Sequence, residues 1–304
     1  MLYCSYNLIF AYFTMTARII DGKKIASEIK ESLREEVKKL KSEGVIPGLA
    51  VLICGNDSAS QIYVRNKEKT AKELGMNSWV YEFLENAGEN EVLETIEKLN
   101  VDKGVNGILV QLPLPSQIDE KKVIEAIDPK KDVDCFHPEN VGKMMIGGAK
   151  LFPCTPAGII EILERNDIEI SGKECVVVGR SNIVGKPMAL MLLEKNGTVT
   201  VAHSKTENLK EVCLRADILV SAVGKAGIIT ADMVKNGAVV IDVGMNHDSS
   251  GKLLGDVDFD SVKEKAAAIT PVPGGVGPMT IAYLMKNVIS LTRGWDDEEF
   301  TSKL

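Results

Sequence analysis

Two side chains four residues apart, Tyr63 and Lys67, fall within a segment whose pattern predicts a helix. Residues at this spacing share one helix face, so a phenol and an amine would lie side by side. A positioned amine can transfer protons, and a phenol ring can stack on an aromatic ligand. A lone Y-x-x-x-K pattern nevertheless fits a solvated helix face better than a catalytic one. It also precedes the glycine-bounded turn described below, which argues against a short-chain dehydrogenase.

Gln111 ends a predicted buried strand over 107–111 and is followed by a proline-rich segment. The carboxyl ends of strands in open α/β sheets face the ligand crevice, which makes Gln111 a candidate site residue. The alternative is a glutamine that only caps the strand through local hydrogen bonds. Asp132 and Asp134 have a strand-like i, i+2 spacing and are expected on one side of the chain. The Pro/Gly-rich segment 271–278 permits close backbone approach to a ligand, although plain turns explain such clusters more often.

Residues 176–185 place a buried strand before a glycine-bounded turn and a predicted helix. Backbone amides at such a turn can meet a phosphate. The segment departs from G-x-G-x-x-G, because Ser181 stands at the second glycine position and Gly185 comes one residue late. The following strand lacks the carboxylate that holds the ribose of NAD, whereas Arg180 and Ser204 suit a 2′-phosphate and favour NADP. Alternatively, Arg180 and Lys205 are only solvated surface cations.

The elements that position these residues alternate between helices and strands. Apolar residues recur at helical spacing after Asp21, and Gly48–Cys54 is a continuous apolar run typical of a strand buried on both faces. Residues 58–61 fit a capping box for the helix that carries Tyr63. Further strands are predicted at 77–83, 107–111, 175–179, 198–202, 218–223 and 238–243. This order predicts an α/β fold with parallel sheets in two domains and a final helix that packs back on the first.

Composition excludes several classes of protein. The chain has 304 residues, 45% of them hydrophobic, and a net charge of −7, which argues against a disordered chain and against a basic nucleic-acid-binding surface. No His/Cys spacing matches a zinc site, so no metal is expected. The six cysteines form no C-x-x-C pair and are expected to be reduced. They are Cys4, Cys54, Cys135, Cys154, Cys175 and Cys213.

The chain termini suggest two weaker signals. Residues 1–17 are uncharged and fairly apolar but too short to span a bilayer, and a second methionine, Met15, directly precedes the first patterned segment. We interpret the start as a dispensable extension or a misassigned start rather than a membrane-associating segment. The last three residues, Ser302, Lys303 and Leu304, spell a peroxisomal address that we attribute to chance.

Several of these motifs, in this order, resemble the bifunctional methylenetetrahydrofolate dehydrogenase/methenyltetrahydrofolate cyclohydrolase family. The resemblance runs from about Ala17 to Leu291 and rests on ASQIYVRNKEK, GILVQLPLP, KDVDCFHP, PCTPAG, VVVGRSNIVGKP, VIDVGMN and ITPVPGGVGPMT. It implies two α/β domains with a cleft between them, the second a Rossmann-like NADP-binding domain. The implied boundaries are 1–14 for an extension of unknown role, 15–154 for the catalytic folate-binding domain and 155–276 for the NADP-binding domain. A C-terminal helix at about 277–294 returns to complete the first domain.

The resemblance also implies which residues form the site. Lys67, Tyr63 and Gln111 are expected to be catalytic, with Lys67 as the general acid and base and Gln111 orienting its amine. The implied folate-binding residues are Tyr63, Ser60, Asp134, Pro273, Gly274, Gly275 and Gly277. The implied cofactor-binding residues are Gly179, Arg180, Ser181, Ser204 and Met245. Cys135 replaces the glycine that usually follows the second Asp, which puts the position of the Asp134 loop in question.

The implied reactions are oxidation of 5,10-methylenetetrahydrofolate with NADP and hydrolysis of the methenyl product to 10-formyltetrahydrofolate. We expect a cytoplasmic homodimer of one-carbon metabolism that serves purine, methionine and histidine biosynthesis. Its partner is a reduced folate, with no nucleic acid and no membrane. One alternative is a monofunctional dehydrogenase that uses NAD, and another is a catalytically silent folate-binding protein.

Overall fold

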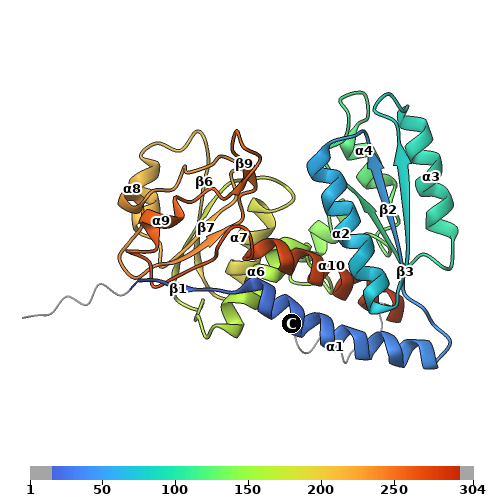
Figure 1. Ribbon diagram of the computed structural model, residues 1–304, viewed down its shortest axis with the longest axis horizontal. Helices are drawn as coiled ribbons and strands as arrows, with labels where there is room; N and C mark the ends of the chain where they lie inside the picture. Colours follow the sequence, from blue (N-terminus) through green and yellow to red (C-terminus); the bar gives the residue numbers. More distant parts are fainter. Residues whose placement is uncertain (1–15, 295–304) are drawn as a thin grey trace, which may run out of the picture.

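The computed structural model describes residues 16–294, which form two α/β lobes joined by long helices (Figure 1). One lobe holds a three-stranded parallel sheet and the other a six-stranded parallel sheet. The expected fold class, two α/β domains with a C-terminal helix returning to the first, is confirmed. The terminal segments 1–14 and 302–304, for which the sequence suggested an extension and a chance address, lie outside the described residues.

The smaller sheet has the order β3-β2-β4, with β2 (Gly48–Cys54) between β3 (Asn77–Phe83) and β4 (Gly107–Val110). Alternate residues of β2 face opposite sides, as strand geometry requires. Leu49, Val51 and Ile53 join the core with α1 (Gly22–Ser42) and α2 (Ser58–Leu74). Ala50 and Leu52 instead pack with α3 (Glu89–Val101) and α4 (Glu120–Ala126). Helices therefore cover both faces, which explains the unbroken apolar run.

The larger sheet has the order β1-β11-β8-β7-β5-β6. Its strands are β1 (Arg18–Ile19), β5 (Glu174–Val178), β6 (Thr198–Ala202), β7 (Ile218–Ser221), β8 (Val239–Asp242) and β11 (Ala268–Ile269). The remaining elements of this lobe are α6 (Cys154–Arg165), α7 (Gly185–Glu194), α8 (Leu209–Leu214), η1 (Ala231–Met233), α9 (Phe259–Val262) and the ribbon of β9 (Asn246–His247) with β10 (Leu253–Leu254). Strand β1, which the sequence assigned to the first domain, pairs with β11 in this sheet. The domain boundaries stay a prediction.

Two helices connect the lobes. Helix α1 runs from the end of β1 toward the smaller sheet, and α10 (Val276–Arg293) lies between the lobes and packs against α1 and α6 (Figure 1). Gly158 of α6 lets α10 approach closely, because a Cβ atom there would stand 2.9 Å from Cβ of Met279. Helix α10, the last one among residues 16–294, therefore packs against elements of both lobes.

Local details differ from the sequence expectations at two places. The N-cap of α2 is Asp57, whose carboxylate accepts a hydrogen bond from the backbone N–H of Ser60, rather than the Ser58 capping box. Residues 131–137, whose acids have strand-like spacing, form turns with a single β-bridge between Asp132 and Ile108 of β4, and they lead into an unpredicted helix, α5 (Pro138–Met145). The Asp132–Asp134 segment is therefore held by this one bridge to β4 and by side-chain contacts rather than by a continuous strand ladder.

Candidate active site

Lys67 projects from α2 toward the end of β4 and is only 8% exposed. Its Nζ donates to Oε1 of Gln111 at 3.0 Å. Nε2 of Gln111 donates to the carbonyl oxygen of Leu112 at 2.8 Å, which fixes the amide so that its oxygen faces the amine. The structure therefore brings two of the three expected catalytic residues into direct contact.

Asp134 is the nearby charge that faces Lys67. Burial lowers the pKa of Lys67, and the negative charge of Asp134 opposes that shift. Burial likewise raises the pKa of Asp134, with Lys67 acting in the opposite direction and Asp132 adding to the rise. Burial disfavours the charged form of each group, and each charge favours the charged form of the other. Such an arrangement suits an acid–base group.

Asp132 and Asp134 have different partners. The buried carboxylate of Asp132 accepts from the backbone N–H of His137 at 2.8 Å and from Nδ2 of Asn140 at 2.9 Å. Asp132 therefore stabilises the turn that leads into α5, whereas Asp134 interacts with Lys67. Cys135 adopts the left-handed conformation with φ +58°, the region that glycine favours. The cysteine therefore keeps the backbone that a glycine would give, and Asp134 still interacts with Lys67.

A cleft of about 450 Å³ lies between α2, α1, the end of β8 and the start of α10. Tyr63 lines it from α2, and its hydroxyl contacts the sulfur of Met245 across the cleft. Burial raises the pKa of this phenol. The expected folate-binding residues Pro273, Gly274, Gly275 and Gly277 all line the same cleft.

Ser60 and Met245 have different surroundings. Ser60 is buried at the first turn of α2, where its backbone N–H completes the Asp57 cap. Met245, expected among the cofactor residues, stands in the cleft wall opposite Tyr63, where the two lobes meet.

The turn from β5 to α7 carries the expected cofactor residues. A Cβ atom on Gly185 would stand 2.3 Å from the carbonyl oxygen of Gly179, so only glycine lets α7 begin this close to the strand end. The Oγ atom of Ser181 accepts from the backbone N–H groups of Val184 and Gly185 at 3.2 and 3.3 Å and shapes the turn. A close-packed glycine turn at a helix N-terminus fits a dinucleotide phosphate.

Arg180 and Ser204 stand at corresponding positions beyond two neighbouring strands. Val178 of β5 is paired with Ala202 of β6, and each candidate residue comes two positions after its strand partner. Both residues are exposed at the carboxyl edge of the sheet. A guanidinium and a hydroxyl at this edge fit a phosphate on the ribose of a dinucleotide.

Two buried carboxylates near the cleft escaped the sequence interpretation. Asp242 ends β8 and lines the cleft, and burial raises its pKa to about 6 although the backbone N–H groups of Gly244, Asp256 and Val257 donate to it. Asp256 accepts from the backbone N–H groups of residues 223–225 and so orders the loop after β7. Their only signal in the sequence was an acid at or near a strand end.

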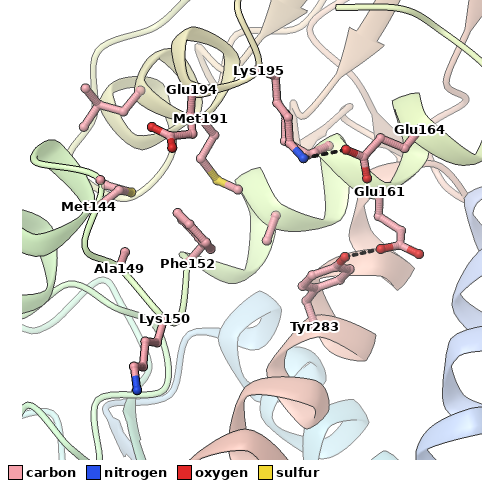
Figure 2. Close-up of a pocket in the computed structure, with 14 residues that line it drawn as sticks. Met144, Ala149, Lys150, Phe152, Glu161, Glu164, Met191, Glu194, Lys195 and Tyr283 are labelled. Atoms are coloured by element: carbon pink, nitrogen blue, oxygen red, sulfur yellow. Dashed lines mark hydrogen bonds and ion pairs between the residues drawn. The ribbon is translucent and has the colours of Figure 1, made fainter. Parts of the chain in front are cut away.

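A separate cavity of about 370 Å³ lies where α5, α6, α7 and α10 meet. Figure 2 shows Glu164 paired with Lys195 and the hydroxyl of Tyr283 turned toward Glu161, with Phe152 and Met191 to the left of both pairs. None of the residues predicted for the site lines this cavity.

The chain matches two models of one family, described as "Tetrahydrofolate dehydrogenase/cyclohydrolase, catalytic domain" over residues 20–134 and "Tetrahydrofolate dehydrogenase/cyclohydrolase, NAD(P)-binding domain" over residues 153–294. The chain belongs to the tetrahydrofolate dehydrogenase/cyclohydrolase family. The "Bifunctional protein FolD" of Acetivibrio thermocellus is 58% identical to this enzyme over 279 residues, which cover 92% of this chain and 98% of the relative.

Solved structures agree with this assignment. The bifunctional FolD enzyme of Campylobacter jejuni is 47% identical to the chain, with a TM-score of 0.89 and coverage of 91% of this chain and 99% of that one. The Trypanosoma brucei enzyme, described as complexed with NADP cofactor and inhibitor, is 40% identical, with a TM-score of 0.88 and coverage of 91% and 97%. The predicted family, the bifunctional dehydrogenase/cyclohydrolase activity and NADP as cofactor are confirmed.

Two further observations concern residues 16–294 alone. None of their helices is long and apolar enough to cross a membrane. Within the same residues, no group of three or more His, Cys, Asp or Glu side chains is arranged to hold a metal ion.

Proposed function

We propose that Lys67 is the proton-transfer group of the hydrolysis step. Water attacks the bridging carbon of the methenyl cation while the neutral amine of Lys67 takes a proton from that water. The resulting tetrahedral intermediate carries a hydroxyl group on this carbon. The bond from the carbon to N5 then breaks as Lys67 returns a proton to N5, and the hydroxyl proton is released to solvent as the C=O bond of the N10-formyl group forms. The lowered pKa of Lys67 supports this role, because it increases the fraction of neutral amine near neutral pH. Gln111 orients the amine through the hydrogen bond at 3.0 Å.

Asp134 and Tyr63 recognise the folate in this proposal. A carboxylate is an acceptor and suits the neighbouring N–H donors of the pterin edge. Tyr63 presents its ring to the benzoyl group in the cleft. The backbone of Pro273, Gly274, Gly275 and Gly277 borders the same space, and Ser60 supports the first turn of α2. The cleft volume of about 450 Å³ falls within the usual range for small-molecule sites.

Gly179 and Ser181 would hold the dinucleotide phosphates, with Arg180 and Ser204 at the 2′-phosphate. NADP, when bound, accepts the hydride from the one-carbon bridge. The protein positions the two ligands for this transfer. Met245, which stands in the cleft wall and contacts Tyr63, would border the nicotinamide in this proposal.

The observation that carries the proposal is the buried Lys67–Gln111 contact beside Asp134. A spectrophotometric assay of methylenetetrahydrofolate with NADP and with NAD, alongside a separate assay of methenyl hydrolysis, tests it in the purified enzyme. We expect both activities and a preference for NADP. An enzyme without hydrolysis would contradict the role of Lys67, and an equal rate with NAD would contradict the role of Arg180.

We also propose a cytoplasmic homodimer of one-carbon metabolism, feeding purine, methionine and histidine biosynthesis, with domains at 15–154 and 155–276. Strand β6 lies at the edge of the larger sheet, and Val201 on it is 39% exposed. Sheet edges of this kind readily meet another chain. Light scattering after size-exclusion chromatography should give about twice the chain mass of 33.0 kDa, and a mass of one chain would contradict the dimer.

A further inference from the structure

Asp134 stands in a segment of turns, so contacts from other elements must set its position. The peptide that joins Val133 to Asp134 is buried, because Val133 is fully enclosed. Val133 also packs closely on β4: a Cβ atom on Gly107 would stand 2.1 Å from its Cγ1. The packed side chain of Val133 therefore fixes one side of this peptide. On the other side, the buried carbonyl oxygen of Val133 needs a hydrogen-bond donor.

Asn287 supplies that contact from the middle of α10. It is 4% exposed, and its Nδ2 donates to the carbonyl oxygen of Val133 at 2.8 Å and to that of Phe152 at 3.0 Å. The same Nδ2 lies 3.5 Å from the sulfur of Cys154. One amide thus joins the two segments that enclose Asp134. Figure 2 shows Phe152 where the chain enters α6, beside the α10 turn that carries Tyr283.

Cys154 reinforces the arrangement. Its thiol donates to the carbonyl oxygen of Val133 at 3.5 Å, so this oxygen receives both the amide of Asn287 and the thiol. The thiol carries one hydrogen, so its hydrogen bond to the Asp134 carboxyl, which opposes the rise in the pKa of that group, is an alternative to the bond to Val133. The amide of Asn287 is therefore the constant donor to the peptide before Asp134, and the thiol from α6 supplements it; neither group belongs to the expected site.

We propose that Asn287 is a positioning residue that holds Asp134 in place for the folate by fixing the Val133–Asp134 peptide. The proposal rests on the proposed role of Asp134 in folate binding. Asn287 acts through Asp134 and touches neither substrate nor cofactor. Without its amide, the carbonyl oxygens of Val133 and Phe152 lose their buried donor, and the segment gains freedom at the point where the pterin binds.

The test compares Asn287→Leu and Asn287→Asp with wild type in the full-length enzyme. Asn287→Leu removes both donors with little change in size, and Asn287→Asp keeps the shape and tests the loss of the N–H groups if the first variant folds poorly. We expect the KM for methylenetetrahydrofolate to rise about tenfold, as for one weakened hydrogen bond to a charged group, while kcat and the Kd for NADP stay within about threefold.

Tyr283→Phe is the matched control, because it removes a buried hydrogen bond from the same helix, to Glu161, and leaves the Asp134 segment intact. It should lower the Tm without changing the folate KM. If the Asn287 variants behave in the same way, with a lower Tm and an unchanged KM, the proposal is overturned.

A double variant separates the folate-binding role of Asp134 from the positioning role of Asn287. In an Asp134→Asn background, Asn287→Leu should change the folate KM less than about twofold, because the residue it positions is already altered. Full additivity would contradict the inference. If Asp134→Asn alone leaves the folate KM unchanged, the proposed role of Asp134 fails. If Asp134→Asn raises this KM and the Asn287 variants do not, only the positioning role fails.

Discussion

Replacement of Lys67 by Met removes the amine from α2 and keeps a flexible apolar side chain in its place. Lys67 is 8% exposed, so the chain of methylene groups is already packed, and methionine fills similar space. Hydrolysis should fall by about 10²- to 10⁴-fold, the usual contribution of a positioned acid–base group. That loss corresponds to about 3–5 kcal/mol of transition-state stabilisation. The oxidation step depends on the relative position of folate and NADP rather than on this proton transfer, so the rate of NADP reduction should fall much less.

Loss of the amine also removes the positive charge opposite Asp134. Breaking a buried ion pair costs about 3–5 kcal/mol when the remaining charge stays ionised. Burial already raises the pKa of Asp134, and without Lys67 that pKa rises further, so the carboxyl takes up a proton. Protonation limits the cost in folding free energy. The variant should therefore fold and still bind NADP.

The assay follows methenyltetrahydrofolate hydrolysis and NADP reduction separately, over a range of pH, in wild type, Lys67→Met and Lys67→Arg. In wild type, hydrolysis should increase with pH through the lowered pKa of Lys67 and then level, because the neutral amine is the reactive form. Arginine keeps the charge opposite Asp134 but stays protonated, so hydrolysis should be lost there too. Full hydrolysis by Lys67→Met would remove Lys67 from the mechanism. Full hydrolysis by Lys67→Arg would show that charge alone suffices.

Four further predictions concern other parts of the molecule. Arg180→Ala should raise the Kd for NADP about 10- to 100-fold and leave that for NAD unchanged, and equal effects would refute the 2′-phosphate contact. Gly179→Ala would place a Cβ atom 2.2 Å from the carbonyl oxygen of Ala222, so thermal unfolding should show a lower Tm and less stabilisation by NADP; unchanged values would contradict the tight turn. Cys135→Gly should leave the folate KM within about twofold, because the backbone is already left-handed, and a larger change would show that the thiol matters for binding. Burial raises the pKa of Asp242 to about 6, so the protonated carboxyl should contribute about 3 kcal/mol to the free energy of unfolding near pH 4, and this contribution should be lost as pH rises through 6. Urea unfolding of Asp242→Asn should therefore show a flatter dependence of stability on pH than wild type. The same pH dependence in both proteins would contradict this prediction.

The sequence predicted the parts of the fold that rest on local pattern. The apolar run of β2 and the helical spacing of α1 match the structure because each buries a whole face against neighbours. The two-residue strands β1 and β11 gave no signal, since pairing between segments about 250 residues apart depends on the assembled sheet. Helix α5 was not predicted, because it directly follows the Asp132–Asp134 segment, whose acids alternate at the spacing typical of a strand.

The sequence predicted part of the candidate site, as it predicted part of the fold. Lys67, Gln111 and Tyr63 came from motifs, and the structure places the first two in contact and the third in the adjoining cleft. What the sequence could not supply were the groups that hold the peptide before Asp134. The thiol of Cys154 and the amide of Asn287 both contact the carbonyl oxygen of Val133, lie at distant positions in the chain and belong to helices whose patterns look purely structural. Long-range polar contacts of this kind leave no periodic trace.

The position of α10 has a consequence for how the protein is made. Asn287 is synthesised about 150 residues after Asp134, a delay of roughly 8–30 s at 5–20 residues per second. Throughout that time the nascent first lobe lacks the helix that packs on β2 and β4 and closes the Asp134 segment. A ribosome that stops early releases a chain with an intact nucleotide turn and an incomplete folate pocket. Acquisition of activity therefore waits for the end of translation.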